Sequence, residues 1–195
     1  MVILIGGVGY AGKTFLAQKL LEKYKFPYLS IDHLKMGMCR ANIDCGFTPL
    51  DSTEHISEKL WPILKGIIMT NIENEQNLIV EGIYLLPNKI NELGDDYLED
   101  VISFYLGFSE EYIEKYFESK ITYHRCVINS RGYDNSDTIS EYISENKIFK
   151  SIYEKNHAKY FEISEDYQKE MEFVHSWIHD CIAGKSPQNI TAQII

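Results

Sequence analysis

The chain has 195 residues, of which 45% are hydrophobic, and a formal net charge of −10 at pH 7. This length and composition predict one folded domain around a single core and do not indicate a disordered protein. The negative charge argues against a nucleic-acid partner, because binding a phosphate backbone needs clustered positive charge. We therefore expect a small-molecule partner.

Cysteine usage and the apolar segments predict a cytoplasmic protein. The cysteines form no C-x-x-C pair and no metal-ligand spacing, which favours reduced thiols. They are Cys39, Cys45, Cys126 and Cys181. The apolar runs are too short to span a membrane, and the first of them leads directly into a glycine-rich loop, which argues against a cleavable signal peptide. We expect no membrane partner.

Five short apolar runs alternate with helix-period segments along the chain. The predicted strands are residues 2–6, 27–31, 77–82, 101–106 and 159–164. This alternation is typical of an α/β fold with a parallel sheet and helices on both faces, in which ligands bind at the carboxyl ends of the strands. Residues 183–195 lack a clear period and are predicted to form a C-terminal tail.

The first predicted strand is followed by GGVGYAGKT, residues 6–14, and then by the helical pattern TFLAQKLLEKY. The spacing Gly7-x4-Gly12-Lys13-Thr14 satisfies the Walker A pattern in its expected context. Glycines bring backbone N–H groups close to an anion, Lys13 reaches the β- and γ-phosphates, and Thr14 ligates Mg²⁺. A plain turn would need neither of these two side chains. The predicted ATP-binding residues are Gly7, Val8, Gly9, Tyr10, Ala11, Gly12, Lys13 and Thr14.

Asp32 ends the second predicted strand in the segment PYLSID. An acid at this position faces the γ-phosphate, where it orients an acceptor hydroxyl and takes its proton. We predict that Asp32 is catalytic and contacts the acceptor. The alternative is an N-cap for a helix that begins at His33.

Glu81 ends the third predicted strand and is followed by Gly82. A carboxylate here is predicted to hold a Mg²⁺-bound water or to bind a hydroxyl of the acceptor, while Gly82 permits close approach. Glu81 is thus both a metal candidate, with Thr14, and a substrate-binding candidate. The alternative is a solvated acid at a strand end.

Arginine is rare in this chain. Only three of the 19 lysines and arginines are arginine, namely Arg40, Arg125 and Arg131. A guanidinium grips phosphate or carboxylate at two points, which an ammonium does not. The polar segment 122–137 is predicted to be a lid over ATP, with Arg125 and Arg131 as catalytic residues. Ordinary surface ion pairs are the alternative. Arg40 is predicted to bind an anionic group of the acceptor.

The segments GGVGYAGKT, SIDHL and IVEGIYLLP and the arginine-bearing segment together resemble the small P-loop kinases of metabolites and nucleosides. This group includes adenylate, shikimate and gluconate kinases, chloramphenicol phosphotransferase and zeta toxins. VEGIYLLP is similar to the EGVHLVP-type segment of 2-phosphoglycerate kinases. The resemblance covers roughly residues 1 to 180, and only its Walker motif is highly specific.

The resemblance implies a three-layer P-loop fold over residues 1–182, with five parallel strands in the order 2-3-1-4-5. It also implies an acceptor-binding region at about 33–70. By resemblance, Asp32 is a base or substrate binder, and Arg125 and Arg131 stabilise the transferring phosphoryl. One departure is Lys35, which stands where adenylate kinases place a substrate-binding arginine. The adenylate kinase lid pattern is not recognisable either.

We expect an ATP-dependent kinase that transfers the γ-phosphoryl of Mg·ATP to a small acceptor, such as a 2-phosphoglycerate-like compound, a sugar acid or a nucleoside. One alternative is a nucleotide-binding regulator, because a Walker A loop indicates binding but not transfer. Another is a toxin or antibiotic-modifying phosphotransferase. GTPase activity is disfavoured, because PNKIN at 87–91 has Asn91 where the guanine motif N-K-x-D requires aspartate.

Overall fold

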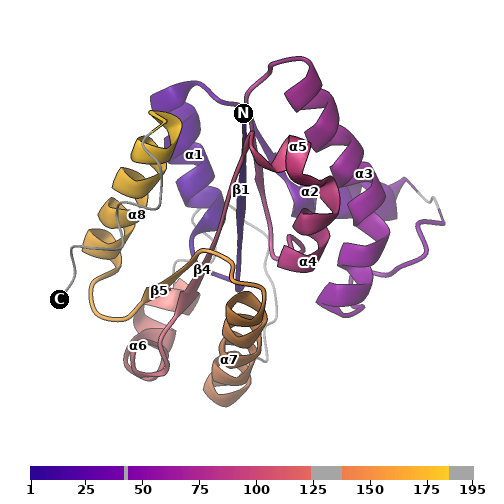
Figure 1. Ribbon diagram of the computed structural model, residues 1–195. Coiled ribbons are helices and arrows are strands. Elements are labelled where there is room, and N and C mark those ends of the chain that lie inside the picture. The colour runs from indigo at the N-terminus through magenta and orange to yellow at the C-terminus, as the bar shows by residue number, and fades with distance from the viewer. Residues whose placement is uncertain (42–43, 124–137, 185–195) are drawn as a thin grey trace.

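The computed structural model describes residues 1–41, 44–123 and 138–184. A central sheet is flanked by helices (Figure 1). The strands are β1 (Val2–Gly7), β2 (Tyr28–Ser30), β3 (Leu78–Glu81), β4 (Val101–Phe108) and β5 (Tyr160–Ile163). The longer helices are α1 (Lys13–Tyr24), α2 (Ile31–Arg40), α3 (Thr53–Glu73), α7 (Ile139–Lys155) and α8 (Tyr167–Ile182). Short elements are α4 (Pro87–Ile90), η1 (Asn91–Leu93), α5 (Asp95–Leu98), α6 (Glu110–Tyr116) and the π-helix η2 (Phe117–Thr122).

The sheet has five parallel strands in the order β2-β3-β1-β4-β5, as predicted. β1 lies at the centre of the sheet, and all six of its residues are buried. Its run of apolar residues and glycines suits this position. Ile5 pairs with Glu81 of β3 on one side and with Phe104 of β4 on the other. The carboxyl end of β1 is therefore level with the acid that ends β3.

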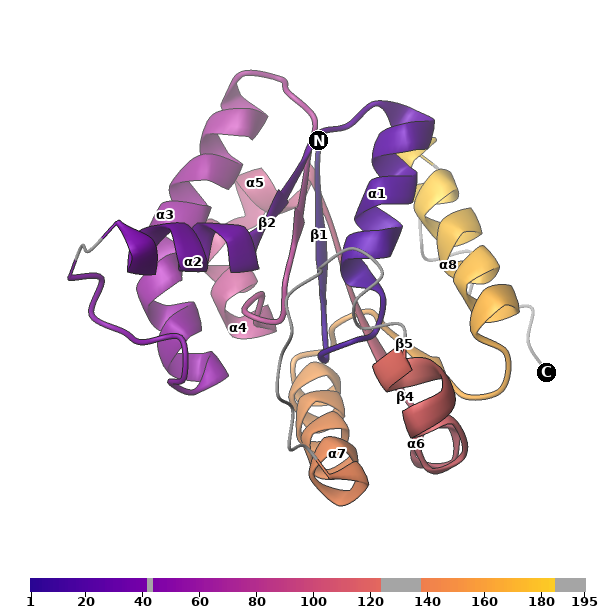
Figure 2. The same ribbon diagram turned by 180° about the vertical axis from the view of Figure 1, so that it is seen from behind.

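Helices cover both faces of the sheet, which gives the predicted three layers. On one face α1 and α8 lie side by side (Figures 1 and 2), and Trp177 of α8 packs edge-on against Phe104. On the other face Tyr153 of α7 stacks on Tyr105, with ring centroids 4.2 Å apart. Because Phe104 and Tyr105 are neighbours in one strand, they point to opposite faces.

The acceptor-binding region predicted at 33–70 consists of α2, a connecting segment and α3. Phe47 and Trp61, which belong to this region, are buried in the core. They therefore stabilise the packing of α3 against the sheet. In the described part of the chain, no helix is long and apolar enough to cross a membrane.

Candidate functional site

Glycines of the loop between β1 and α1 serve different purposes. Gly7 has a φ of +126°, and a Cβ there would collide with the Leu106 carbonyl of the neighbouring strand. Gly12 has a φ of +84°, and a Cβ there would collide with the Tyr167 hydroxyl. At Gly9, in contrast, no atom of the described residues lies within 4 Å of the Cβ position. The fold thus requires glycine at Gly7 and Gly12, whereas Gly9 borders open space.

Lys13 is the first residue of α1 and is buried, with its Nζ 2.5 Å from the Val8 carbonyl oxygen that accepts its hydrogen bond. Burial lowers the pKa of this ammonium, and the negative charges of Glu81, Asp32 and Glu145 oppose that effect. The carboxylates come from β3, α2 and α7, so three separate elements bring negative charge to Lys13. Glu145 was not among the residues predicted from the sequence.

Thr14 and Glu81 form a pair of oxygen donors at the start of α1. The Thr14 hydroxyl donates a hydrogen bond of 3.1 Å to Glu81 Oε1. Glu81 is only 2% exposed, so the alternative of a solvated acid is wrong. A hydroxyl and a carboxylate are ligands that Mg²⁺ prefers, usually together with water and substrate phosphates. These two residues fit the predicted metal site.

Asp32 lies in the first turn of α2, which begins at Ile31 with Ser30 as its N-cap. The N-cap alternative for Asp32 is therefore wrong, because the helix begins two residues earlier than it assumed. The Asp32 side chain is 46% exposed, and its Oδ1 lies 3.1 Å from Lys35 Nζ. This carboxylate thus borders solvent.

Lys35 links Asp32 to Tyr84, which follows the end of β3. Its Nζ donates a 2.6 Å hydrogen bond to the Tyr84 hydroxyl and lies 4.9 Å from the centroid of that ring. Burial lowers the pKa of Lys35, but the interactions with Tyr84 and Asp32 have a larger combined effect. The pKa of the Lys35 ammonium is therefore raised above its ordinary value. Ser57 of α3 fixes the other end of Tyr84 by donating to its carbonyl at 2.7 Å. Asp32 thus has a cationic neighbour anchored to both β3 and α3.

Gly82 permits the close approach of a neighbouring element of the fold. A Cβ at this position would lie 2.9 Å from the Cβ of Ile31. Gly82 therefore allows the start of α2 to pack against the end of β3, which places Asp32 on the same edge of the sheet as Glu81.

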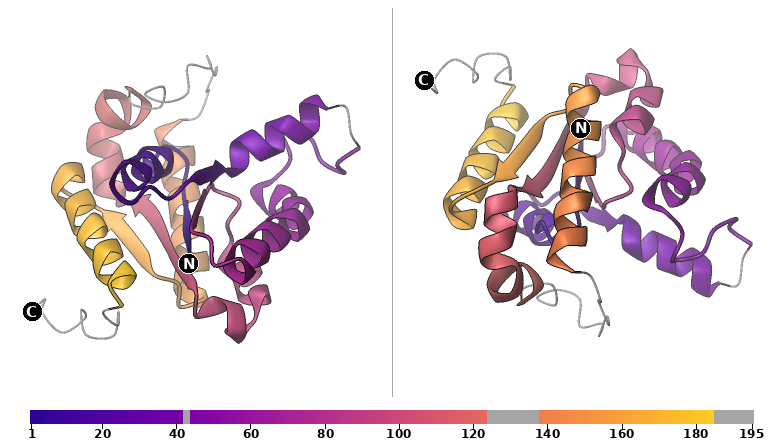
Figure 3. Two further views of the ribbon diagram at one scale, coloured as in Figure 1. Left: turned by 90° about the horizontal axis from the view of Figure 1, so that it is seen from above. Right: turned by 90° about the horizontal axis from the view of Figure 1, so that it is seen from below.

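Arg40 lies at the opposite end of α2 from Asp32 and is exposed. At about 1.5 Å per residue, their Cα atoms are separated by about 12 Å along the helix axis. α2 continues outward from β2, away from the sheet (Figure 3). The structure thus brings Lys35, and not Arg40, next to Asp32, and the acceptor role of Arg40 stays a prediction.

Arg125 and Arg131 lie outside the described residues. Of the predicted lid at 122–137, the structure describes only Thr122, at the end of η2, and Tyr123. The catalytic role of the two arginines therefore stays a prediction. Of the predicted tail, Ala183 and Gly184 are described.

Two tyrosines that belong to no sequence motif contact the glycine-rich loop. The Tyr142 hydroxyl of α7 donates a 2.6 Å hydrogen bond to the Gly9 carbonyl. Tyr167, the first residue of α8, approaches Gly12, and burial raises its pKa to about 12. No local pattern could have found them, because each contact joins residues more than a hundred positions apart.

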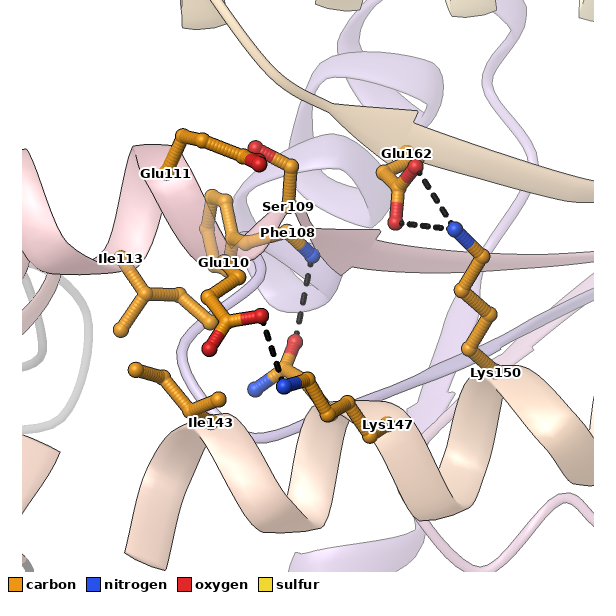
Figure 4. A pocket seen from close by; sticks show the side chains of 10 residues that line it. Phe108, Ser109, Glu110, Glu111, Ile113, Ile143, Lys147, Lys150 and Glu162 are labelled. Atoms are coloured by element: carbon orange, nitrogen blue, oxygen red, sulfur yellow. Dashed lines mark hydrogen bonds and ion pairs between the residues drawn. The ribbon is translucent and has the colours of Figure 1, made fainter. Parts of the chain in front are cut away.

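A separate pocket of about 320 Å³ lies between α6, α7 and the ends of β4 and β5 (Figure 4). Its lining contains no residue of the glycine-rich loop. Four of the five charged side chains that line this pocket are already paired: Lys147 with Glu110 at 2.6 Å, and Lys150 with Glu162 at 2.8 Å. Binding an ion there would require these pairs to separate, so the pocket adds no part to the site around Lys13.

No family model matches the chain, and no curated protein matches its sequence. Solved structures do match its fold. A protein from Chloroflexus aurantiacus that carries a provisional kinase name is 16% identical, with a TM-score of 0.58 and coverage of 95% of this chain and 97% of that one. Shikimate kinase from Aquifex aeolicus is 16% identical, with a TM-score of 0.52 and coverage of 93% and 99%. A sugar kinase from Janibacter is 13% identical, with a TM-score of 0.51 and coverage of 91% and 94%.

At these identities the likeness concerns the fold. The chain has the fold of small P-loop kinases, over nearly the full length of each chain compared. The implied fold and strand order are confirmed. Function must be argued from the site itself, because one fold supports many activities.

Proposed function

We propose that the protein is an ATP-dependent kinase that phosphorylates a hydroxyl group of a small metabolite. The observation that supports this most strongly is the part-buried Thr14–Glu81 pair beside Lys13, at the N-terminus of α1. This combination provides a cation for phosphate, oxygen ligands for Mg²⁺ and a helix N-terminus that favours an anion. Mg²⁺, when bound by Thr14 and Glu81, would neutralise charge on the phosphate oxygens.

The proposed reaction is an in-line transfer. The acceptor oxygen forms a bond to the γ-phosphorus while the bond from that phosphorus to the β–γ bridging oxygen breaks, which releases ADP. The proton of the acceptor hydroxyl passes to Asp32. Lys13 stabilises the negative charge that develops on the phosphate oxygens. The residues thus contribute position, charge and one proton acceptor.

The acceptor side supports a hydroxyl-bearing metabolite as substrate. Asp32 is half exposed and forms an ion pair with the buried Lys35, so an acceptor would meet a carboxylate whose position an ammonium holds. The matching fold of a shikimate kinase and a sugar kinase is consistent with an acceptor of this kind. Both the class of acceptor and the use of ATP belong to the proposal.

The proposal is tested by measuring ADP production from Mg·ATP in the presence of candidate acceptors. The candidates are a panel of sugar acids, sugars, nucleosides and phosphoglycerates. We expect at least one class to stimulate ADP release and Lys13→Ala to abolish the stimulation. Lys19→Ala is the matched control, because Lys19 lies on the same helix with an exposed side chain. ATP binding without any acceptor-dependent turnover would instead support a nucleotide-binding regulator.

A further inference from the structure

Tyr142 connects α7 to the glycine-rich loop across 133 positions of sequence. Its side chain is buried, and its hydroxyl donates to the Gly9 carbonyl at 2.6 Å. The Tyr142 ring also contacts Tyr10, the next loop residue, with centroids 6.1 Å apart. On its other side the ring packs on Phe117 of η2 at 5.4 Å. Tyr142 is therefore held in place by two rings as well as by its hydrogen bond.

The backbone of α7 near Tyr142 is tied to the sheet by Asn146, one turn later. Asn146 is 4% exposed, and its amide group is hydrogen-bonded at both ends. Its Oδ1 accepts from the Phe108 N–H at the end of β4 at 3.1 Å, a bond drawn in Figure 4. Its Nδ2 donates to the Tyr142 carbonyl at 2.8 Å. The backbone of Tyr142 is thus tied to the sheet through Asn146, while its ring and hydroxyl contact the loop.

The contact fixes the orientation of one peptide group. In a trans peptide the C=O and the following N–H point in opposite directions. Holding the Gly9 carbonyl toward α7 therefore directs the Tyr10 N–H away from α7. Tyr10 has a φ of +58°, a left-handed conformation that is uncommon outside glycine and places successive N–H groups around a concavity suited to an anion. A flipped peptide would present the carbonyl oxygen there instead.

We propose that Tyr142 is a positioning residue that holds the Gly9–Tyr10 peptide in the orientation that binds phosphate. This inference rests on the proposed nucleotide binding and not on phosphoryl transfer. Tyr142 acts through the loop backbone and touches no substrate atom. Its hydroxyl makes a neutral hydrogen bond to the Gly9 carbonyl, so loss of that bond should allow the flipped orientation to compete.

The experiment compares Tyr142→Phe with Tyr153→Phe by calorimetric titration with ADP and with inorganic tripolyphosphate. Tyr153 is a matched control because it is a buried tyrosine of the same helix whose hydroxyl has no hydrogen-bond partner among the described residues. We expect Tyr142→Phe to weaken binding of both probes by the same factor, about three- to tenfold. Tyr153→Phe should leave both affinities unchanged.

An equal factor for the two probes identifies an effect on the phosphate cradle, because tripolyphosphate has no base or sugar. Wild-type affinity for tripolyphosphate in Tyr142→Phe would overturn the inference, as would a loss confined to ADP. The Tyr10 amide resonance provides a second measurement if stability also changes. It should shift on tripolyphosphate binding in the wild type and in Tyr153→Phe, and shift much less in folded Tyr142→Phe.

The proposed function and this inference fail in distinguishable ways. If the wild-type protein binds both probes but phosphorylates no acceptor, only the proposed transfer fails, and the two tyrosine variants still decide the role of Tyr142. If the wild-type protein does not bind tripolyphosphate, the phosphate site itself is refuted and the inference fails with it.

Discussion

The carboxyl edge of the sheet has two sides that differ in how firmly the fold holds their polar groups. On the loop side, Lys13 and Glu81 are buried, and each is hydrogen-bonded to a neighbour. On the α2 side, Asp32 is 46% exposed, and Arg40 lies at the outer end of the helix. The loop side is therefore preorganised, whereas the α2 side is open to solvent.

This difference has a physical reason. A phosphate chain is bound by backbone N–H groups and one cation, and such a cradle works only if its backbone cannot rearrange. Recognition of an acceptor needs a few side chains placed around a space that a ligand enters. Substitutions on the loop side should therefore affect all phosphate chemistry, while those on the α2 side should affect only the acceptor.

The largest effect is expected for Lys13→Ala on the loop side. Removing the ammonium withdraws the charge that stabilises the transferring phosphoryl, so turnover should fall roughly a thousandfold. The fold should persist, because the buried cation that is removed is disfavoured by desolvation. Turnover is measured as ADP production with the acceptor that the panel identifies. A folded Lys13→Ala protein with undiminished turnover would contradict the kinase assignment.

Asp32→Asn tests the α2 side. Asparagine keeps the size of the side chain but is a much weaker proton acceptor, so acceptor phosphorylation should fall roughly a hundredfold. ATP affinity and melting temperature should stay near wild type, because the side chain is half exposed and does not cap α2. Asp96→Asn, in the first turn of α5, is the control. A parallel loss of ATP affinity would show that the two sides are not separate.

Gly9→Ala and Gly12→Ala distinguish a loop glycine that the fold requires from one that affects only phosphate binding. Alanine at Gly12 must adopt a positive φ and meets Tyr167, so we expect a loss of roughly 2 kcal/mol or more in the free energy of unfolding. Alanine at Gly9 meets no atom of the described residues, so the free energy of unfolding should be near wild type while ADP binds more weakly. Thermal unfolding and ADP titration measure the two quantities. Equal destabilisation by both substitutions would refute the distinction.

The smallest effect is expected at His175 on α8, away from both sides of the edge. Burial, with Lys23 and Lys19 of α1, lowers its pKa below the ordinary value of 6.5. His175 therefore binds a proton more readily in the unfolded chain than in the folded one. The free energy of unfolding thus decreases as pH falls below about 6.5. His175→Gln should reduce this loss in melting temperature between pH 7 and 5 and leave ADP affinity unchanged. An identical pH profile in the variant would contradict the interpretation.

The sequence predicted the fold well, because local patterns determine strands of this kind. The predicted strand at 27–31 is observed at Tyr28–Ser30, and the predicted strand at 77–82 is observed at Leu78–Glu81. The Walker spacing likewise identified Lys13 and Thr14, because their roles follow from their position at the start of a helix.

The rest of the site depends on contacts between distant segments, which no local pattern contains. Gly82 was expected to permit a close approach, and that the group that approaches is Ile31 becomes evident only when α2 packs against β3. Tyr142 occupies a position of α7 that is typical of any buried aromatic residue, and its hydroxyl bond to the loop depends on how α7 is placed. The same applies to Glu145 and Tyr167.

Helices on both sides of the sheet also give the protein two built-in optical reporters. The chain has two tryptophans, and both are buried. Trp61 belongs to α3, whereas Trp177 of α8 packs against Phe104 and Phe161 on the other face. A Trp61→Phe variant would therefore report by fluorescence on the α8 layer alone, and Trp177→Phe on the α3 layer. Different unfolding midpoints in urea would show that the two layers unfold in sequence. The same midpoint for both variants would show that the layers unfold together.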